Sequence, residues 1–204
     1  MLRVSKTMLV MVFIHLLSPS SASAQRWVKL FDGQSLNGWH TLEGGKWEIK
    51  DGVLIGSSPL AEQKHGILVS NKIYKDFEVE VKYKAVKGNS GLYFRVDKSG
   101  DGVGVHGFQA EIDAKADVGG LYETAGRAWV VQPTAEQVAT WFKPQKWNTM
   151  KVRAVGGDVT VWVNKKKSAG LKNDKGRKQG HIALQLHGNQ DMEVQFKSVK
   201  IKEL

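Results

Sequence analysis

The stretch Phe77-Glu-Val-Glu-Val-Lys-Tyr-Lys-Ala85 alternates apolar and charged side chains with a period of two. All its apolar residues fall on one face of an extended chain, and its Glu and Lys residues fall on the other. This pattern is typical of an antiparallel strand that packs one face on a core and exposes the other to water. The stretch therefore predicts a protein built from sheets.

Similar short runs occur along the chain, and Asp51-Gly52 and Gly156-Gly157 are turn sequences typical of hairpins. We expect further strands at residues 46–49, 53–55, 92–96, 108–112, 147–155, 159–163, 182–186 and 192–201. The helix candidate is residues 134–142, where Thr134 and Gln137 have the spacing of a capping box. These features predict an all-β fold, a two-sheet antiparallel sandwich with at most one short helix.

The composition limits which functional groups the chain can use. The chain has 204 residues and a formal charge of +10, and it contains no cysteine. A thiol nucleophile, a disulfide and a Cys-ligated metal are therefore excluded. His65, His106, Glu111 and Asp113 do not have a known metal-ligand spacing, so we expect no metal and no cofactor. His, carboxylate, Arg, Tyr and hydroxyl groups remain as candidates for function.

The first 24 residues have the pattern of a secretory signal peptide. Arg3 and Lys6 precede an apolar run at residues 8–17, and Ala22-Ser-Ala24 supplies small residues for cleavage. We expect cleavage near Ala24, a single domain over residues 25–204, and a secreted or periplasmic protein without a membrane span. Loss of Arg3 and Lys6 would lower the formal charge from +10 to +8. An uncleaved N-terminal anchor is the alternative.

The positive charge does not indicate a nucleic-acid partner. The basic residues are scattered along the strands, and they cluster only at residues 165–167 and 172–178, in sequences typical of turns. We interpret these clusters as solvated loops and expect no nucleic acid to bind. Weak adhesion to anionic polymers of the cell envelope is the alternative.

Three predicted strands carry functional groups on the face opposite their apolar residues. By alternation, these groups are Tyr93, Arg95 and Asp97, then Gln109, Glu111 and Asp113, and finally His181, Gln185 and His187. If the strands are neighbours, the groups form one polar face. Such a face suits a sugar, whose hydroxyls bind polar side chains and whose C–H faces stack on aromatic rings such as Tyr93, Tyr122 or Trp129.

Each of these residues also has a structural interpretation. Arg95 could pair with Glu111 across the sheet as a structural ion pair. Asp113 could close a turn, and His187 could be a strand-end histidine whose ring is satisfied locally.

Several motifs together resemble the 3-keto-disaccharide hydrolase family. They are Leu30-Phe-Asp-Gly-Gln-Ser-Leu-Asn-Gly-Trp39, Trp47-Glu-Ile-Lys-Asp-Gly-Val-Leu54, Gly88-Asn-Ser-Gly-Leu-Tyr-Phe-Arg95, Gly107-Phe-Gln-Ala-Glu-Ile-Asp113, Gly120-Leu-Tyr122, Trp147-Asn148, Gly180-His-Ile-Ala-Leu-Gln-Leu-His-Gly188 and residues 194–204. The resemblance covers nearly all of residues 25–204 and implies the concanavalin A-like lectin/glucanase sandwich, a jelly roll. The chain departs from the family pattern at one place. The family usually has Glu and then Gln at two positions on the same strand face, whereas this chain has Gln109 and then Glu111.

The resemblance implies an enzyme that cleaves the glycosidic bond of 3-keto-glycosides. A ketone at C3 acidifies the proton on C2, so that a base can remove it and the leaving group can be eliminated before water adds. The implied base is His187 or Glu111, Arg95 and Gln185 are implied donors to the enolate, and Tyr122 is an implied acid. The implied substrate-binding residues are Tyr93, Gln109, Asp113, Tyr122 and Gln185.

Three alternatives remain at this point. Glu111 and Asp113 could act as the carboxylate pair of an ordinary glycosidase. The same sandwich could also serve as a non-catalytic carbohydrate-binding module, because one fold hosts lectins and enzymes alike. A structural or adhesion protein of the envelope is the third alternative.

Overall fold

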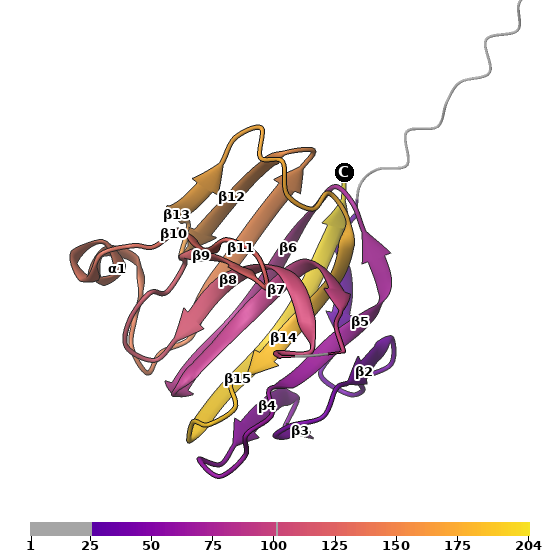
Figure 1. Ribbon diagram of the computed structural model, residues 1–204. Helices are drawn as coiled ribbons and strands as arrows, with labels where there is room; N and C mark the ends of the chain where they lie inside the picture. The colour runs from indigo at the N-terminus through magenta and orange to yellow at the C-terminus, as the bar shows by residue number, and fades with distance from the viewer. Residues whose placement is uncertain (1–25, 101) are drawn as a thin grey trace, which may run out of the picture.

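Two antiparallel sheets packed face to face make up the fold (Figure 1). The computed structural model describes residues 26–100 and 102–204. The predicted signal peptide, residues 1–24, lies outside the described residues. The predicted two-sheet antiparallel sandwich is confirmed.

The first sheet has eight strands in the order β13-β12-β11-β6-β15-β4-β3, and β1 also pairs with β15. Its strands are β1 (Val28–Phe31), β3 (Lys46–Lys50), β4 (Val53–Ser58), β6 (Phe77–Lys87), β11 (Asn148–Val155), β12 (Asp158–Val163), β13 (Lys166–Leu171) and β15 (Met192–Glu203).

The second sheet has seven strands in the order β10-β9-β8-β7-β14-β5-β2. Its strands are β2 (Trp39–Thr41), β5 (Gly66–Tyr74), β7 (Asn89–Lys98), β8 (Val105–Asp113), β9 (Leu121–Thr124), β10 (Ala128–Val131) and β14 (Gly180–Leu186). β7, β8 and β14 are the three strands whose polar face was expected to carry function, and they are neighbours.

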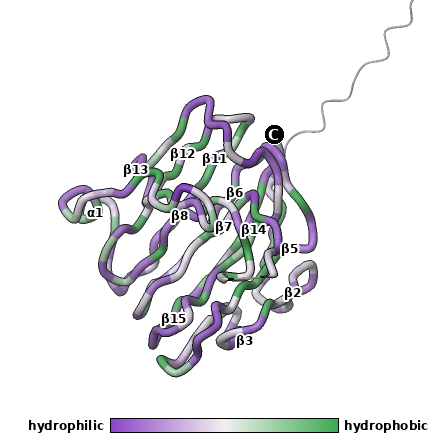
Figure 2. The backbone as a smooth tube through the Cα atoms, in the orientation of Figure 1, coloured by the Kyte–Doolittle hydropathy of each residue, from purple (hydrophilic) through white to green (hydrophobic). Residues whose placement is uncertain are grey.

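The core fills the space between the sheets. β6 lies between β11 and β15, and its residues Phe77, Val79, Val81 and Tyr83 are fully buried, as the alternation predicts. Figure 2 shows hydrophobic stretches along the strands and hydrophilic connections at the edges. A second, smaller apolar cluster lies on the other face of the seven-stranded sheet, around Ile67, Val69 and Tyr93.

One short helix, α1 (Ala135–Trp141), connects β10 to β11. The Thr134 hydroxyl accepts a hydrogen bond from the Gln137 backbone N–H, and the Gln137 side chain accepts one from the Thr134 N–H. The predicted capping box is therefore confirmed. Among residues 26–100 and 102–204, no helix has the length and apolar character needed to cross a bilayer.

Candidate functional site

A pocket of about 360 Å³ opens on the outer face of the seven-stranded sheet. Its volume lies in the range of ligand-binding pockets. Strands β7, β8, β9, β10 and β14 all contribute to it, because side chains at alternate positions point to this outer face. The lining residues are His65, Asn89, Tyr93, Val103, Gln109, Glu111, Tyr122, Thr124, Ala125, Trp129, Gln185 and His187.

Side-chain amides surround the carboxyl group of Glu111 at the pocket floor. Gln109 Nε2 donates to Glu111 Oε2 at 2.8 Å and contacts Gln185 Oε1 at 3.0 Å, and Asn89 Nδ2 donates to Glu111 Oε1. Gly91 on β7 leaves the space for this network, since a Cβ there would lie 2.4 Å from Gln109 Nε2. The network holds the three polar side chains of β8 and β14 in fixed positions.

Burial changes the acidity of Glu111. The side chain is almost fully buried, and the desolvation of its charged form raises its pKa to about 8, with small contributions from the negative charges of Asp113 and Asp117. The hydrogen bond from Asn89 opposes this effect without cancelling it. Glu111 is therefore mainly protonated at neutral pH and can give a proton to a ligand.

Two histidines meet at one side of the pocket. The rings of His65 and His187 lie 4.4 Å apart between centroids, in an edge-to-face arrangement. His187 Nδ1 lies 2.6 Å from the carbonyl oxygen of Gly188, so this nitrogen carries the proton and Nε2 of the neutral ring is an acceptor. His187 can therefore take a proton from a ligand.

His65 is in the opposite tautomer to His187, with its proton on Nε2 and not on Nδ1. Its Nδ1 lies 3.3 Å from Gln185 Nε2 and 3.4 Å from the Gly188 backbone nitrogen, both of which are donors. Nδ1 is therefore the acceptor, and Nε2 carries the proton of the neutral ring. Burial, with the neighbouring His187 as a second cause, lowers the pKa of His65 to about 4. His65 therefore stays neutral and offers an N–H donor over the whole neutral range.

Aromatic side chains form the opposite wall. Tyr122 on β9 and Trp129 on β10 are register partners, and their rings lie 5.3 Å apart at right angles. Tyr93 also lines the pocket and is buried, and its hydroxyl lies 3.0 Å from Thr124 Oγ1. Aromatic rings beside polar groups can bind the two kinds of surface that a sugar presents.

The structure brings most of the sequence-predicted site residues together. The following six all line the one pocket: Tyr93, Gln109, Glu111, Tyr122, Gln185 and His187. Five of them come from β7, β8, β9 and β14, which are adjacent in the sheet, and His187 directly follows β14.

Arg95 is not among them, and the prediction that it shares a face with Glu111 is wrong. The pairing of β7 with β8 shifts between Phe94 and Asp97, and Arg95 has a φ of +53°. This β-bulge interrupts the alternation, so that Val96 instead joins Tyr93 in the outer apolar cluster. Gly180 allows the bulge, because a Cβ there would lie 2.3 Å from the Arg95 carbonyl carbon.

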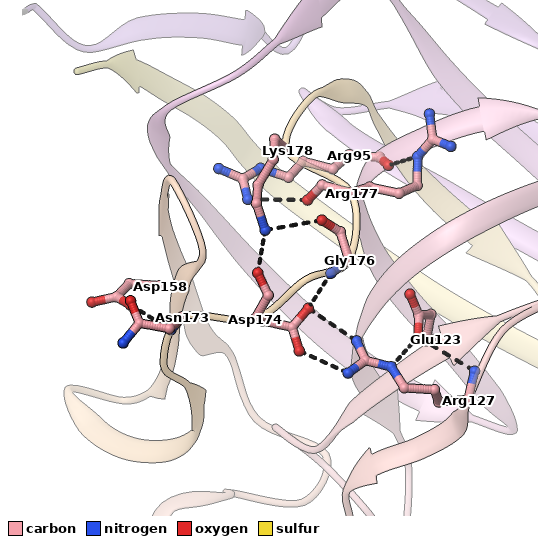
Figure 3. Close-up of polar contacts among 9 residues, drawn as sticks. All are labelled: Arg95, Glu123, Arg127, Asp158, Asn173, Asp174, Gly176, Arg177 and Lys178. Atoms are coloured by element: carbon pink, nitrogen blue, oxygen red, sulfur yellow. Dashed lines mark hydrogen bonds and ion pairs between the residues drawn. The ribbon is translucent and has the colours of Figure 1, made fainter.

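The Arg95 side chain binds backbone carbonyls away from the pocket. It donates to the carbonyl oxygens of Lys75 at 2.8 Å, Gly156 at 2.8 Å and Arg177 at 3.2 Å, and it lies 3.3 Å from Asp76 Oδ1. Figure 3 shows its contact with the loop that contains Arg177. The alternative interpretation of Arg95, an ion pair with Glu111, is also wrong, and the buried guanidinium instead joins three segments of the chain.

Asp113 closes a turn, as its structural interpretation expected. Its Oδ1 accepts hydrogen bonds from the backbone N–H groups of Lys115 at 2.6 Å and Ala116 at 2.9 Å. Asp113 does not line the pocket among the described residues. The expected substrate contact of Asp113 is therefore not supported, and Glu111 has no second carboxylate beside it in the pocket lining.

Sequence reasoning missed three polar residues of the pocket, His65, Asn89 and Thr124, and two apolar ones, Val103 and Ala125. Asn89 could have been found, because the alternation Tyr93, Gly91, Asn89 continues along β7 past the predicted start of the strand. No sequence pattern placed His65 at the site, where it is half-buried against His187. No group of three His, Asp or Glu residues that could hold a metal occurs in the described part of the chain.

Solved structures confirm the fold at low sequence identity. A candidate glycosyl hydrolase from Parabacteroides distasonis superposes with a TM-score of 0.64 at 23% identity, covering 88% of this chain and 100% of that one. The carbohydrate-binding module CBM66 from Bacillus subtilis superposes with a TM-score of 0.62 at 20% identity, covering 81% of this chain and 96% of that one. At these identities the likeness is one of fold.

Sequence comparison gives the family. A 3-keto-disaccharide hydrolase from Bacteroides thetaiotaomicron is 31% identical over 80 residues, which is 35% of this chain and 28% of that protein. This match alone therefore spans less than a third of the curated relative. The model of the 3-keto-alpha-glucoside-1,2-lyase-like domain family matches residues 26–202. The chain therefore belongs to the 3-keto-alpha-glucoside-1,2-lyase-like domain family.

Proposed function

We propose that the pocket cleaves the glycosidic bond of a 3-keto-disaccharide by elimination followed by hydration. One observation carries the proposal. A histidine whose Nε2 is an acceptor lines the same pocket as a carboxyl group whose pKa is raised to about 8. An elimination needs both a base and an acid at neutral pH, and His187 and Glu111 supply them.

The first step is removal of the proton on C2 by His187 Nε2. The electron pair of the C2–H bond becomes an enolate over C2, C3 and the ketone oxygen. We assign the stabilisation of that oxygen to the neutral His65, through its Nε2–H, and to Gln185, because both line the pocket next to His187. His65 takes the donor role expected of Arg95, whose guanidinium binds the carbonyls of Lys75, Gly156 and Arg177 instead.

The second step breaks the bond between C1 and the leaving oxygen. The enolate pair forms the C1–C2 double bond, the C3 ketone is restored, and the leaving oxygen takes the proton of Glu111. Water then adds at C1 while a proton returns to C2, so the net reaction is hydrolysis. Tyr122 and Trp129 provide the surface on which the flat enone can stack.

Solvent deuterium tests the elimination. Cleavage of a 3-keto-disaccharide in D₂O should place deuterium at C2 of the released 3-keto sugar, because the original C2 proton is lost and C2 is reprotonated from solvent. Mass spectrometry and proton NMR of the product measure this incorporation. The corresponding unoxidised disaccharide should not be cleaved, since its C2 proton is not acidic.

Two controls make the result decisive. A 3-keto sugar also enolises without an enzyme, so a parallel sample without protein gives the background exchange. Cleavage that leaves the original hydrogen at C2 would rule out the elimination and point to direct displacement at C1.

A non-catalytic carbohydrate-binding module is the second candidate, and the likeness to CBM66 favours it. The two candidates differ in one measurement. Calorimetry that detects binding of a 3-keto-disaccharide, together with chromatography that finds no fragment after long incubation, would support the module and exclude the enzyme.

We also propose that the enzyme is exported. Expression in a bacterial host that secretes it should give a mature protein beginning at Gln25, since the pattern of residues 1–24 is that of a cleaved signal peptide. Mass analysis of the purified protein measures this. A chain that retains Met1 in the exported fraction would contradict the proposed cleavage.

A further inference from the structure

A second pocket, of about 450 Å³, lies beside the first one. The two pockets share Thr124 and Ala125, at the turn between β9 and β10. Thr124 also contacts the hydroxyl of Tyr93 in the first pocket. A molecule that fills the first pocket could therefore extend past this turn into the second.

The walls of the second pocket are mainly polar. His106 comes from β8, Glu123 from β9, and Arg177 from the loop before β14. The aromatic pair of Tyr122 and Trp129 belongs to the first pocket. Because the second pocket has polar walls and lacks this aromatic pair, it is better suited to a hydroxyl-rich ring than to an aromatic group.

Arg177 has a fixed orientation in this wall. Its Nε donates to the carbonyl oxygen of Arg95 at 2.9 Å, its Nη1 lies 3.0 Å from His106 Nε2, and its Nη2 donates to Asp97. Among the described residues, these bonds use three of the five N–H groups of the guanidinium. A planar donor that is already held in place loses little freedom when it binds a ligand.

The bulge at Arg95 provides that support. Arg95 and Arg177 bind each other reciprocally, because the Arg95 guanidinium donates to the Arg177 carbonyl oxygen while the Arg95 carbonyl accepts from Arg177 Nε (Figure 3). The positive φ of Arg95 interrupts the alternation of β7 at this point. The buried Arg95 is thus a positioning residue for Arg177.

The opposite wall is tied to the same loop. Arg127, in the β9–β10 turn, binds Asp174 with two bonds of 2.7 and 3.1 Å and also pairs with Glu123 (Figure 3). Asp174 lies three residues before Arg177. The two sides of the second pocket are therefore connected by ion pairs and form one preorganised site.

We infer that the second pocket binds the leaving sugar of the disaccharide, and that Arg177 recognises its hydroxyls. This inference rests on the proposed function, in which the keto ring occupies the first pocket. Arg177 lines the second pocket and not the first, so a keto ring held in the first pocket should not contact it. Arg177 should therefore matter for substrates with two rings and not for substrates with one.

Two substrates that share the keto ring test this. They are a 3-keto-disaccharide and methyl 3-keto-α-glucoside, which both release an alcohol that needs a proton from Glu111 but differ in the second ring. In Arg177→Met, kcat/KM for the disaccharide should fall about 10- to 100-fold, the effect of losing hydrogen bonds from a charged donor. The value for the methyl glycoside should stay unchanged. Arg177→Lys, which keeps the charge without the planar fork, should give an intermediate loss.

Lys175→Met is the matched control, because Lys175 is an exposed cation of the same loop. It should leave both substrates unaffected. An equal loss on both substrates in Arg177→Met, or no loss on the disaccharide, would overturn the inference. Circular dichroism and thermal unfolding of each variant separate a folding defect from a binding defect.

Failure of the proposed function would be visible separately, as a wild-type protein that cleaves neither substrate. Calorimetry with the same two sugars then tests the second pocket by itself. Tighter binding of the two-ring sugar by the wild type, lost in Arg177→Met, supports the inference. Equal binding of both sugars contradicts it.

Discussion

Replacing His187 by glutamine is expected to lower turnover of a 3-keto-disaccharide by about 10² to 10⁴, the usual contribution of a general base. Glutamine keeps a similar size and a hydrogen-bonding group, but it cannot take a proton at neutral pH. His187 is only partly buried, and its Nδ1 contact is with the neighbouring Gly188. Substrate binding and thermal stability should therefore stay close to those of the wild type.

His181→Gln is the control for this variant. His181 lies on β14, the strand that ends directly before His187, and its Nδ1 contacts the carbonyl oxygen of Ser70 at 2.7 Å, away from the pocket lining. Its turnover should match the wild type. Nearly normal turnover in His187→Gln would instead assign the base to ionised Glu111, and the rate of that variant would then rise as the pH rises through 8.

The sandwich could be predicted because the alternation of apolar and polar residues along a strand shows which side chains are buried. The strands predicted from alternation, such as the one at Phe77, lie within strands of the structure, except that the one at 147–155 begins one residue before β11. β5 is different, since Ile67, Leu68 and Val69 are all fully buried. The two sides of β5 face the main core and the outer cluster, so its sequence does not alternate and the strand was missed.

The site could be predicted in part, for the same reason. Alternation placed Gln109 and Glu111 correctly because β8 is regular over these residues. It failed at Arg95, where one bulge reverses every later position of β7. It also could not place His65 against His187, because their contact joins two segments that are distant in sequence and depends on the pairing of β5 with β14.

Glu111→Gln is expected to lower turnover of the disaccharide by about 10² or more, because the leaving oxygen loses its proton donor. A 3-keto-glucoside with a p-nitrophenolate leaving group needs no such proton and should be cleaved at nearly the wild-type rate. In the wild type, kcat/KM for the disaccharide should fall as the pH rises above about 8, where Glu111 loses its proton. Equal losses on both substrates would show that Glu111 is not the acid.

The same substitution should change stability in a pH-dependent way. The pKa of Glu111 is about 8 in the folded protein and 4.5 as its ordinary value, so the unfolded chain releases this proton first. Between these pH values the unfolded state binds fewer protons than the folded state, and the wild type loses stability as the pH rises. Glutamine cannot ionise, and Glu111→Gln removes this loss.

The size of the effect follows from about 1.4 kcal/mol for each pKa unit, which sets a ceiling of about 5 kcal/mol at pH 9. Glutamine also places an N–H₂ group among the amides of Asn89 and Gln109, which costs about 1–3 kcal/mol at every pH. Urea unfolding should therefore find Glu111→Gln less stable than the wild type at pH 4 and about 2 kcal/mol more stable at pH 9. Glu193→Gln, on β15 of the other sheet, is the control and should follow the wild-type profile. Parallel profiles for Glu111→Gln and the wild type would mean that Glu111 ionises alike in both states, and it could not then be the proton donor at neutral pH.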